Sequence, residues 1–142
     1  MTSKTPKRKA RPGVDGYGRS PLHYAAADGE LKKCKELLTA GADPNTQDDN
    51  GRTPLHFAAQ ANAAEVAAAL IEAGAVLDST DAYGNTPLST AVFNSLGKGD
   101  LIAALRMAGA DPHAKNNHGV SPLSLARTIT NFDVAQHFDD LP

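Results

Sequence analysis

The chain has 142 residues, a single cysteine and a formal net charge of −2. One cysteine excludes an internal disulfide, and no stretch combines the cysteines and histidines of a structural zinc site. The polar N-terminus resembles neither a secretory signal nor a membrane span. We therefore expect a single domain that folds without metal, cofactor or cross-link in a reducing compartment, away from membranes.

Charge divides the chain into a basic tail and an acidic body. The tail, residues 1–14, holds five of the fourteen basic residues and no acidic one, so it carries +5 and the body −7. Its basic residues are Lys4, Lys7, Arg8, Lys9 and Arg11. We expect a disordered solubilising tail, with a nuclear-import signal as the alternative. Because the acidic body would repel phosphate, nucleic acid is not the expected ligand.

One phrase, Gly-x-Ser/Thr-Pro-Leu, occurs four times in the body. Its prolines, which are 33, 33 and 35 residues apart, are Pro21, Pro54, Pro87 and Pro122. A second phrase beginning Gly-Ala follows in step at Gly41, Gly74 and Gly109. Two phrases repeating in the same register indicate a chain built from stacked copies of one unit.

The phrases predict where helices begin and end. A serine or threonine before proline accepts a hydrogen bond at a helix start, and proline suits the first helical position. Apolar residues at helical spacing, such as Val66, Leu70 and Ile71, then predict a second helix with one buried face. The glycine of the second phrase ends that helix, since glycine adopts the left-handed conformation at little cost.

Period, phrase order and turn residues together resemble the ankyrin repeat over about residues 15–141. The resemblance implies an all-α solenoid of four stacked helix-turn-helix units with projecting β-turn fingers. We divide this domain, 15–142, into repeats at about 15–47, 48–80, 81–115 and 116–142. In this family, partners usually dock on the fingers and on the concave surface lined by the first helices.

Two departures from the repeat pattern stand out. The third repeat has two extra residues within residues 95–99, where we expect a mobile loop. The fourth repeat has Arg127 where the others have small or apolar residues, and it ends without another Gly-Ala phrase. The fourth repeat is therefore expected to cap the stack.

No residue pattern predicts catalysis or metal binding. His23 and His56 share one place in the repeated phrase, where we expect each to bond the backbone of the adjacent turn. The other histidines, His113, His118 and His137, are expected to be solvated. Cys34 is expected to be a buried, inert thiol. Residues 97–100 lack the full phosphate-loop motif.

The positions that the repeat framework leaves free form the candidate protein-binding site. By the family pattern these are Tyr17, Arg19, Asp28, Gln47, Asp49, Asn50, Arg52, Gln60, Tyr83, Asn85, Phe93, Asn94, Lys115, Asn117, His118, Val120 and Thr128. Aromatic residues and arginines dominate interface energies, so we expect hot spots at Tyr17, Tyr83, Phe93, Arg19 and Arg52. For Phe93 the alternative is packing beneath the inserted loop.

The sequence thus predicts a non-enzymatic protein that binds another protein on its concave face and fingers and is a monomer when free. By analogy with small ankyrin-only inhibitors and toxin-immunity proteins, we expect it to mask one partner in the cytoplasm. The alternative is a nuclear or chromatin-associated adaptor that uses the basic tail as its localisation signal. An enzyme is the third class, and no catalytic constellation supports it.

Overall fold

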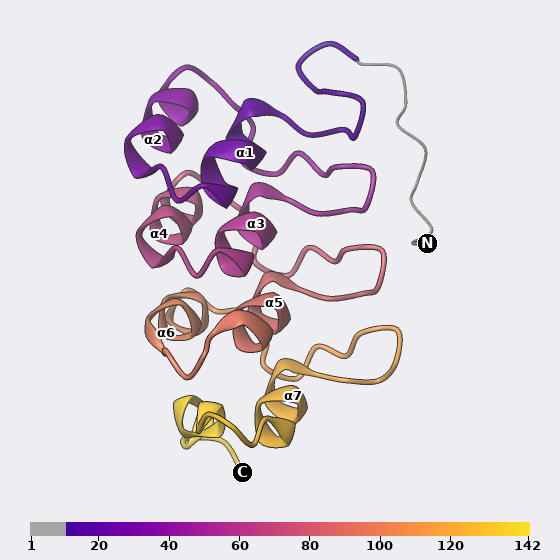
Figure 1. Ribbon diagram of the computed structural model, residues 1–142, viewed down its shortest axis with the longest axis vertical. Helices are drawn as coiled ribbons and strands as arrows, with labels where there is room; N and C mark the ends of the chain where they lie inside the picture. The colour runs from indigo at the N-terminus through magenta and orange to yellow at the C-terminus, as the bar shows by residue number, and fades with distance from the viewer. Residues whose placement is uncertain (1–10) are drawn as a thin grey trace.

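Pairs of short helices stack along one axis in a computed structural model that describes residues 11–142 (Figure 1). The helices are α1 (Pro21–Ala27), α2 (Leu31–Thr39), α3 (Pro54–Gln60), α4 (Ala64–Glu72), α5 (Pro87–Asn94), α6 (Asp100–Met107), α7 (Pro122–Thr128) and the 3-10 helix η1 (Val134–Phe138). The inner helices α1, α3, α5 and α7 form one column, and α2, α4, α6 and η1 form the outer column. This all-α solenoid of repeated helix pairs confirms the predicted fold.

Each inner helix begins where the repeated phrase predicts. In every case proline is the first helical residue, and the serine or threonine before it has extended backbone. Ser121 Oγ, for example, accepts a hydrogen bond from the Ser124 N–H at 3.1 Å. These side chains satisfy N–H groups that would otherwise lack a partner at the helix start.

The core is a continuous row of leucines and alanines between the two columns. Leu22, Leu55 and Leu88 occupy the same place in successive inner helices and are fully buried. The outer helices contribute residues such as Val66 and Leu70, also buried. Because helices of seven to nine residues are unstable alone, this packing between neighbouring repeats is what stabilises them.

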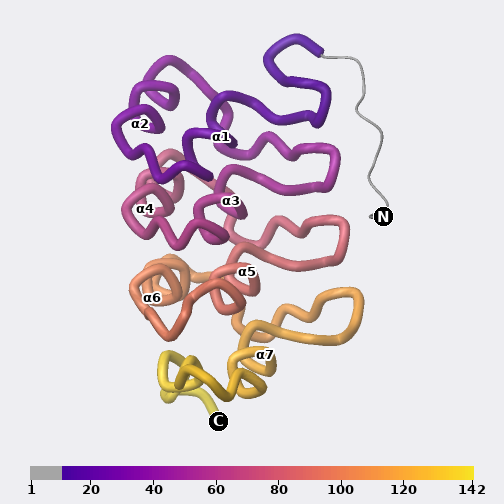
Figure 2. Tube along the Cα trace, in the orientation of Figure 1, coloured from indigo at the N-terminus to yellow at the C-terminus, as the bar shows by residue number. Residues whose placement is uncertain are grey.

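The turns that precede α1, α3, α5 and α7 project to one side as four fingers, named first to fourth in chain order (Figure 2). Each finger is built around one side-chain oxygen that accepts two backbone N–H groups; in the third, Asp81 Oδ1 accepts from Tyr83 and Asn85, both at 2.9 Å. Asp15, Asp48 and Asn116 do the same in the other fingers. Adjacent fingers are joined by backbone hydrogen bonds, such as Asn117 N–H to Tyr83 O at 2.9 Å. The fingers therefore form one connected row.

The C-terminal cap differs from the prediction in one residue. The expectation of a solvated His137 is wrong, because its ring is half-buried and its Nε2 lies 3.0 Å from the Gly97 carbonyl oxygen. Phe132 packs against Gly97 in the same loop. The inserted loop, residues 95–99, is thus the surface on which the cap packs. Its first residue, Ser95, is buried; its hydroxyl donates to the Val92 carbonyl of α5 and accepts the Gly97 N–H of the loop.

Part of the predicted basic tail contacts the fingers. Arg11 and Val14 form an isolated β-bridge, and Arg11 Nη2 lies 2.8 Å from Asp49 Oδ1 on the second finger. Residues 1–10, which include the rest of the basic run, lie outside the described residues.

Candidate functional site

A groove of about 450 Å³ lies on the concave side of repeats two to four. Eight predicted site residues line it: Arg52, Gln60, Tyr83, Asn85, Phe93, Asn94, His118 and Val120. They come from the second, third and fourth fingers and from α3 and α5, so the stacking of repeats brings them to one surface. The groove is therefore where predicted residues of three repeats meet.

The remaining predicted residues lie outside this groove. The first two fingers hold Tyr17, Arg19, Gln47, Asp49 and Asn50, and the fourth finger holds Lys115 and Asn117. Asp28 follows α1, and Thr128 is the last residue of α7. Since backbone hydrogen bonds join the fingers, the finger residues among these continue the candidate surface along the row beyond the groove.

Two large aromatic side chains stand at the groove with most of their surface open. Tyr83 on the third finger is 59% exposed, and Phe93 on α5 is 73% exposed. Phe93 therefore does not pack under the inserted loop, whereas Phe132 does contact that loop at Gly97. Exposed aromatic rings beside a hollow are typical of residues that become buried in a protein interface.

The two predicted arginines face buried carboxylates as well as solvent. Arg19 Nε lies 3.3 Å from Asp48 Oδ2 and Arg52 Nε lies 3.9 Å from Asp81 Oδ2, and both carboxylate side chains are almost fully buried. Removing either arginine would leave a buried negative charge without its partner. Both arginines therefore stabilise the finger row, which the sequence did not predict.

His23 joins the first repeat to the second and His56 joins the second to the third, each through the backbone of the adjacent turn, as predicted. His56 Nδ1 lies 3.1 Å from the Thr53 N–H, which donates to it, so its hydrogen is on Nε2 and is donated to the Asn85 carbonyl at 2.9 Å. His23 makes the equivalent bonds to Ser20 and Arg52. Burial lowers the pKa of both histidines below the ordinary value of 6.5. The neutral ring is the form that this arrangement stabilises.

Six groove residues were not among the predicted ones. They are His56, Asp81, Ser89, Thr90, Asn116 and Leu125. Ser89 and Thr90 are the two residues that directly follow the phrase, where the second repeat has His56 and Phe57. Comparing the copies at these two places was the available signal, because inner-helix residues there face the concave side.

The remaining candidates from the sequence are the cysteine, a metal site and a membrane span. Cys34 is fully buried, and its burial raises the pKa of the thiol, so the prediction of a buried residue is confirmed. Among residues 11–142, no three His, Cys, Asp or Glu side chains are placed to hold a metal ion. The described helices are all too short or too polar to cross a membrane.

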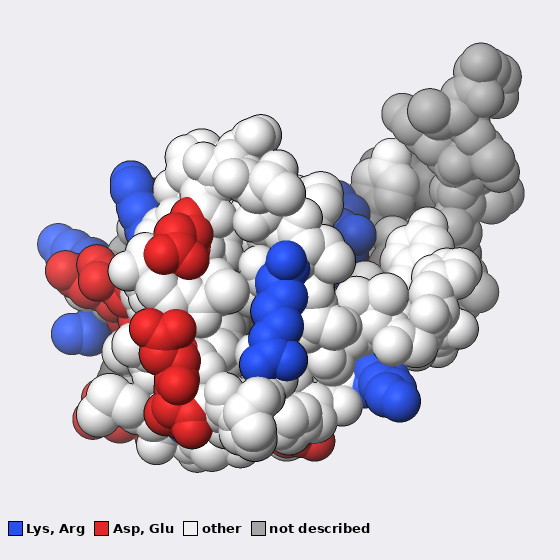
Figure 3. All heavy atoms as spheres, turned by 90° about the horizontal axis from the view of Figure 1, so that it is seen from below, with Lys and Arg blue, Asp and Glu red and all other residues white. Residues whose placement is uncertain are grey.

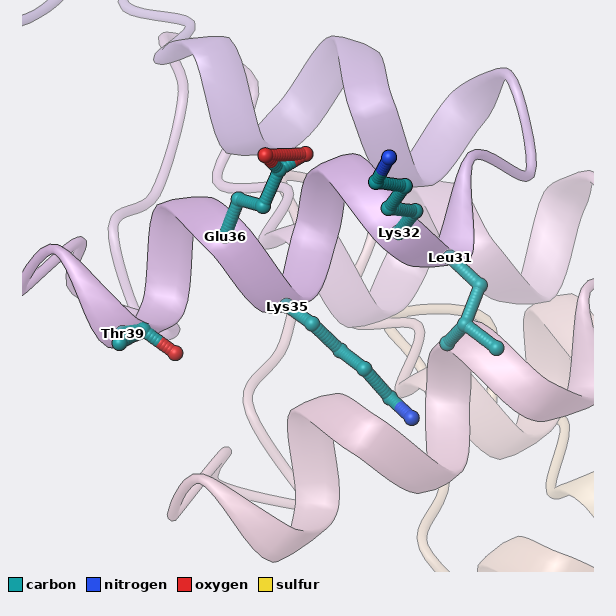
Figure 4. Close-up of a pocket in the computed structure, with 5 residues that line it drawn as sticks. All are labelled: Leu31, Lys32, Lys35, Glu36 and Thr39. Carbon is teal, nitrogen blue, oxygen red and sulfur yellow. The ribbon is translucent and has the colours of Figure 1, made fainter.

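A second hollow, of about 590 Å³, lies on the outer helix α2. Its lining comes from this one helix, and Figure 4 shows Lys32 and Glu36 pointing to one side while Leu31 and Lys35 point to the other. The side chains do not converge on one point. We therefore place the candidate site in the concave groove.

Charge on the described surface is predominantly acidic. Residues 11–142 hold all sixteen acidic residues and ten of the fourteen basic ones. At the end of the stack shown in Figure 3, acidic and basic side chains lie interspersed, with no continuous basic face. A phosphate backbone would find no basic track on this face.

Fold and groove together define a helical-repeat solenoid whose concave side carries exposed aromatic side chains. The profile of the family described as ankyrin repeats (3 copies) matches residues 22–116. The chain therefore belongs to the ankyrin-repeat family, whose members are generally non-catalytic protein–protein interaction modules. A comparison with curated proteins returned no match.

Proposed function

We propose that this ankyrin-repeat module binds and masks a single protein partner in the cytoplasm, as an inhibitor or immunity protein does. The observation that supports this is the groove, where Tyr83 and Phe93 stand exposed beside a hollow lined by three successive repeats. One continuous concave surface suits one partner better than several. Binding there needs no change in the helices, since the residues of the groove are already assembled.

The second candidate is a nuclear or chromatin-associated adaptor, in which Lys7, Arg8, Lys9 and Arg11 form a localisation signal. The observation in its favour is the basic run itself. Deleting residues 1–10 separates the two proposals. A masking protein should retain its partner affinity and its inhibition after the deletion, whereas an adaptor should bind normally but lose its nuclear location, measured by fractionation.

The binding surface itself is tested by truncating the two exposed aromatic residues. Tyr83→Ala and Phe93→Ala should each weaken the complex by about 1 to 4 kcal/mol and leave the melting temperature nearly unchanged. Both rings are exposed in the free protein, so they contribute little to folding. Isothermal titration with the purified partner measures the affinity, and differential scanning calorimetry measures the stability.

Lys35→Ala on α2 and Glu72→Ala on α4 are the matched controls. Both side chains are exposed on the outer column, and an isolated exposed charge contributes about 0 to 1 kcal/mol. Neither change should alter binding. Loss of affinity in these two variants, with Tyr83→Ala and Phe93→Ala binding normally, would place the partner on the convex side and refute the proposed surface.

A further inference from the structure

In the crevice between the inner helices α1 and α3, the ring of Phe57 fills the space. The ring of Phe57 meets the ring of His23 edge to face, with centroids 5.5 Å apart at an angle of 87°. The guanidinium of Arg19 lies 5.2 Å from the centre of the same Phe57 ring. Phe57 is thus held between an imidazole and a guanidinium, two groups that favour an aromatic ring.

The next crevice, between α3 and α5, has the same walls one repeat further along the chain. His56 and Arg52 lie 33 residues after His23 and Arg19. The imidazole Nε2 of both histidines lies 2.9 Å from a carbonyl oxygen of the following finger. Both arginines face a buried aspartate, Asp48 or Asp81.

The residue that would fill this second crevice is small. Thr90 stands 33 residues after Phe57 and carries no ring. His56, Arg52 and Thr90 all line the groove of about 450 Å³. A cavity of roughly 150 Å³ is enough to accept benzene, so the groove has room for an aromatic side chain. By the repeat spacing Thr90 corresponds to Phe57, so the groove is lined by a small residue where the first crevice has a ring.

We infer that the partner inserts a phenylalanine or tyrosine side chain into the crevice between α3 and α5. The inserted ring takes the place that Phe57 has in the preceding crevice, edge-on to His56 and beneath Arg52. Phe93 and Tyr83 stand at the same groove and cover the anchor from solvent. This inference rests on the proposed role as a protein-binding module and names the chemistry that its groove selects.

The direct test uses a small aromatic probe with the full-length chain. N-acetyl-phenylalanine amide, titrated to millimolar concentration, should shift the backbone amide signals of Ser89, Thr90 and Phe93 in two-dimensional NMR spectra. N-acetyl-leucine amide, which lacks the ring, should shift them clearly less. Equal shifts from the two probes, or none at these residues, would overturn the inference.

Two substitutions test whether the ring site is the one that Thr90 leaves open. Thr90→Phe should occupy the crevice with the chain's own ring and abolish the probe-induced shifts. If that variant does not fold, Thr90→Leu replaces it and should reduce the shifts. The matched control is Thr39→Phe, which adds the same ring on the exposed end of α2 and should leave the shifts intact. Phe57→Thr should open the first crevice and add a second set of shifts around His23. Probe binding unaffected by Thr90→Phe would refute the assignment.

The purified partner separates this inference from the proposed function. Thr90→Phe should weaken the complex at least about tenfold, as loss of one buried anchor does, while Thr39→Phe should not. If Tyr83→Ala and Phe93→Ala weaken the complex but Thr90→Phe does not, the protein-binding surface stands and the aromatic anchor is wrong. If none of these three variants weakens it, the partner does not bind in the groove, and the proposed binding surface fails together with the anchor.

Discussion

At the scale of single residues, the buried histidines His23 and His56 couple α1 and α3 to the finger that follows each of them. The Nδ1 atom of His56 must stay unprotonated to accept the Thr53 N–H, while Nε2–H donates to the next repeat. Burial is the largest cause of its lowered pKa, and the nearby Arg52 charge acts in the same direction, whereas Asp81 opposes it. Protonation of His56 would therefore break the hydrogen bond from the Thr53 N–H at the start of α3 and place a charge in the core.

The stability of the protein should fall as the pH drops below about 6.5, the value of an unperturbed histidine. A histidine whose folded pKa is lowered binds its proton more weakly in the folded state. Its contribution is present above the unfolded pKa and is lost as the pH falls toward the folded pKa. Each histidine contributes a slope of at most about 1.4 kcal/mol per pH unit. Urea titrations at pH 7.5 and pH 5 measure the effect.

His56→Gln is the control for this pH dependence. The variant should be less stable than the natural protein at pH 7.5, and the difference should shrink at pH 5, where the natural imidazole is penalised. Asp15 and Asp140 do not titrate between pH 5 and pH 7.5, because hydrogen bonds hold the pKa of each below its usual 3.8. A difference that stays constant between the two pH values would show that His56 does not titrate in this range.

At the scale of the elements, the fingers approach each other so closely that glycine is required at their contacts. Gly84 has φ +79°, and a Cβ there would lie 2.8 Å from the backbone nitrogen of Asn117. That nitrogen donates to the Tyr83 carbonyl, so a side chain at Gly84 would push apart the hydrogen bond that joins the third and fourth fingers. Gly119 has nearly the same φ, +77°, but nothing within 4 Å of its Cβ position.

Gly84→Ala should therefore destabilise the protein more than Gly119→Ala. Both variants place an L-residue in left-handed backbone at a cost of about 1 to 2 kcal/mol. Only Gly84→Ala adds overpacking against a neighbouring backbone, worth about 1 to 3 kcal/mol more. Denaturant unfolding of the two variants measures the difference. Similar losses would mean that the fingers move apart freely and do not form a connected row.

Most of these elements were predictable because their causes are local. Ser20 and Thr53 precede proline in the repeated phrase, and each helix begins there. The contact of His137 with Gly97 was not predictable, since the two residues are 40 apart and no sequence pattern links them. The ion pairs Arg19–Asp48 and Arg52–Asp81 recur at one spacing of 29 residues, so the repeat carried a signal for them that was not used. The groove was predicted in part. Its finger residues and Phe93 followed from the family pattern, but Ser89 and Thr90 required a comparison of the copies of the repeat.

At the scale of the whole molecule, stability depends on how many neighbours each repeat has. The inner helix α3 packs against both α1 and α5, and its own partner α4 packs against α2 and α6. The last inner helix, α7, packs against α5 and the cap but has no further repeat beyond it within the described chain. A defect in the second repeat therefore affects two interfaces, whereas a defect in the cap affects one.

Leu55→Ala should consequently destabilise the protein far more than Leu141→Ala. Leu55 is fully buried in α3, where its removal leaves a cavity that neighbours on both sides prevent from collapsing, at a cost of about 2 to 5 kcal/mol. Leu141 lies partly buried at the edge of the core, so water can reach the space it leaves, and its loss should cost less than about 2 kcal/mol. Urea titration followed by circular dichroism gives both values. Equal losses would contradict a stack in which each repeat is stabilised by its nearest neighbours, and would indicate that the cap and the centre unfold as one tightly coupled unit.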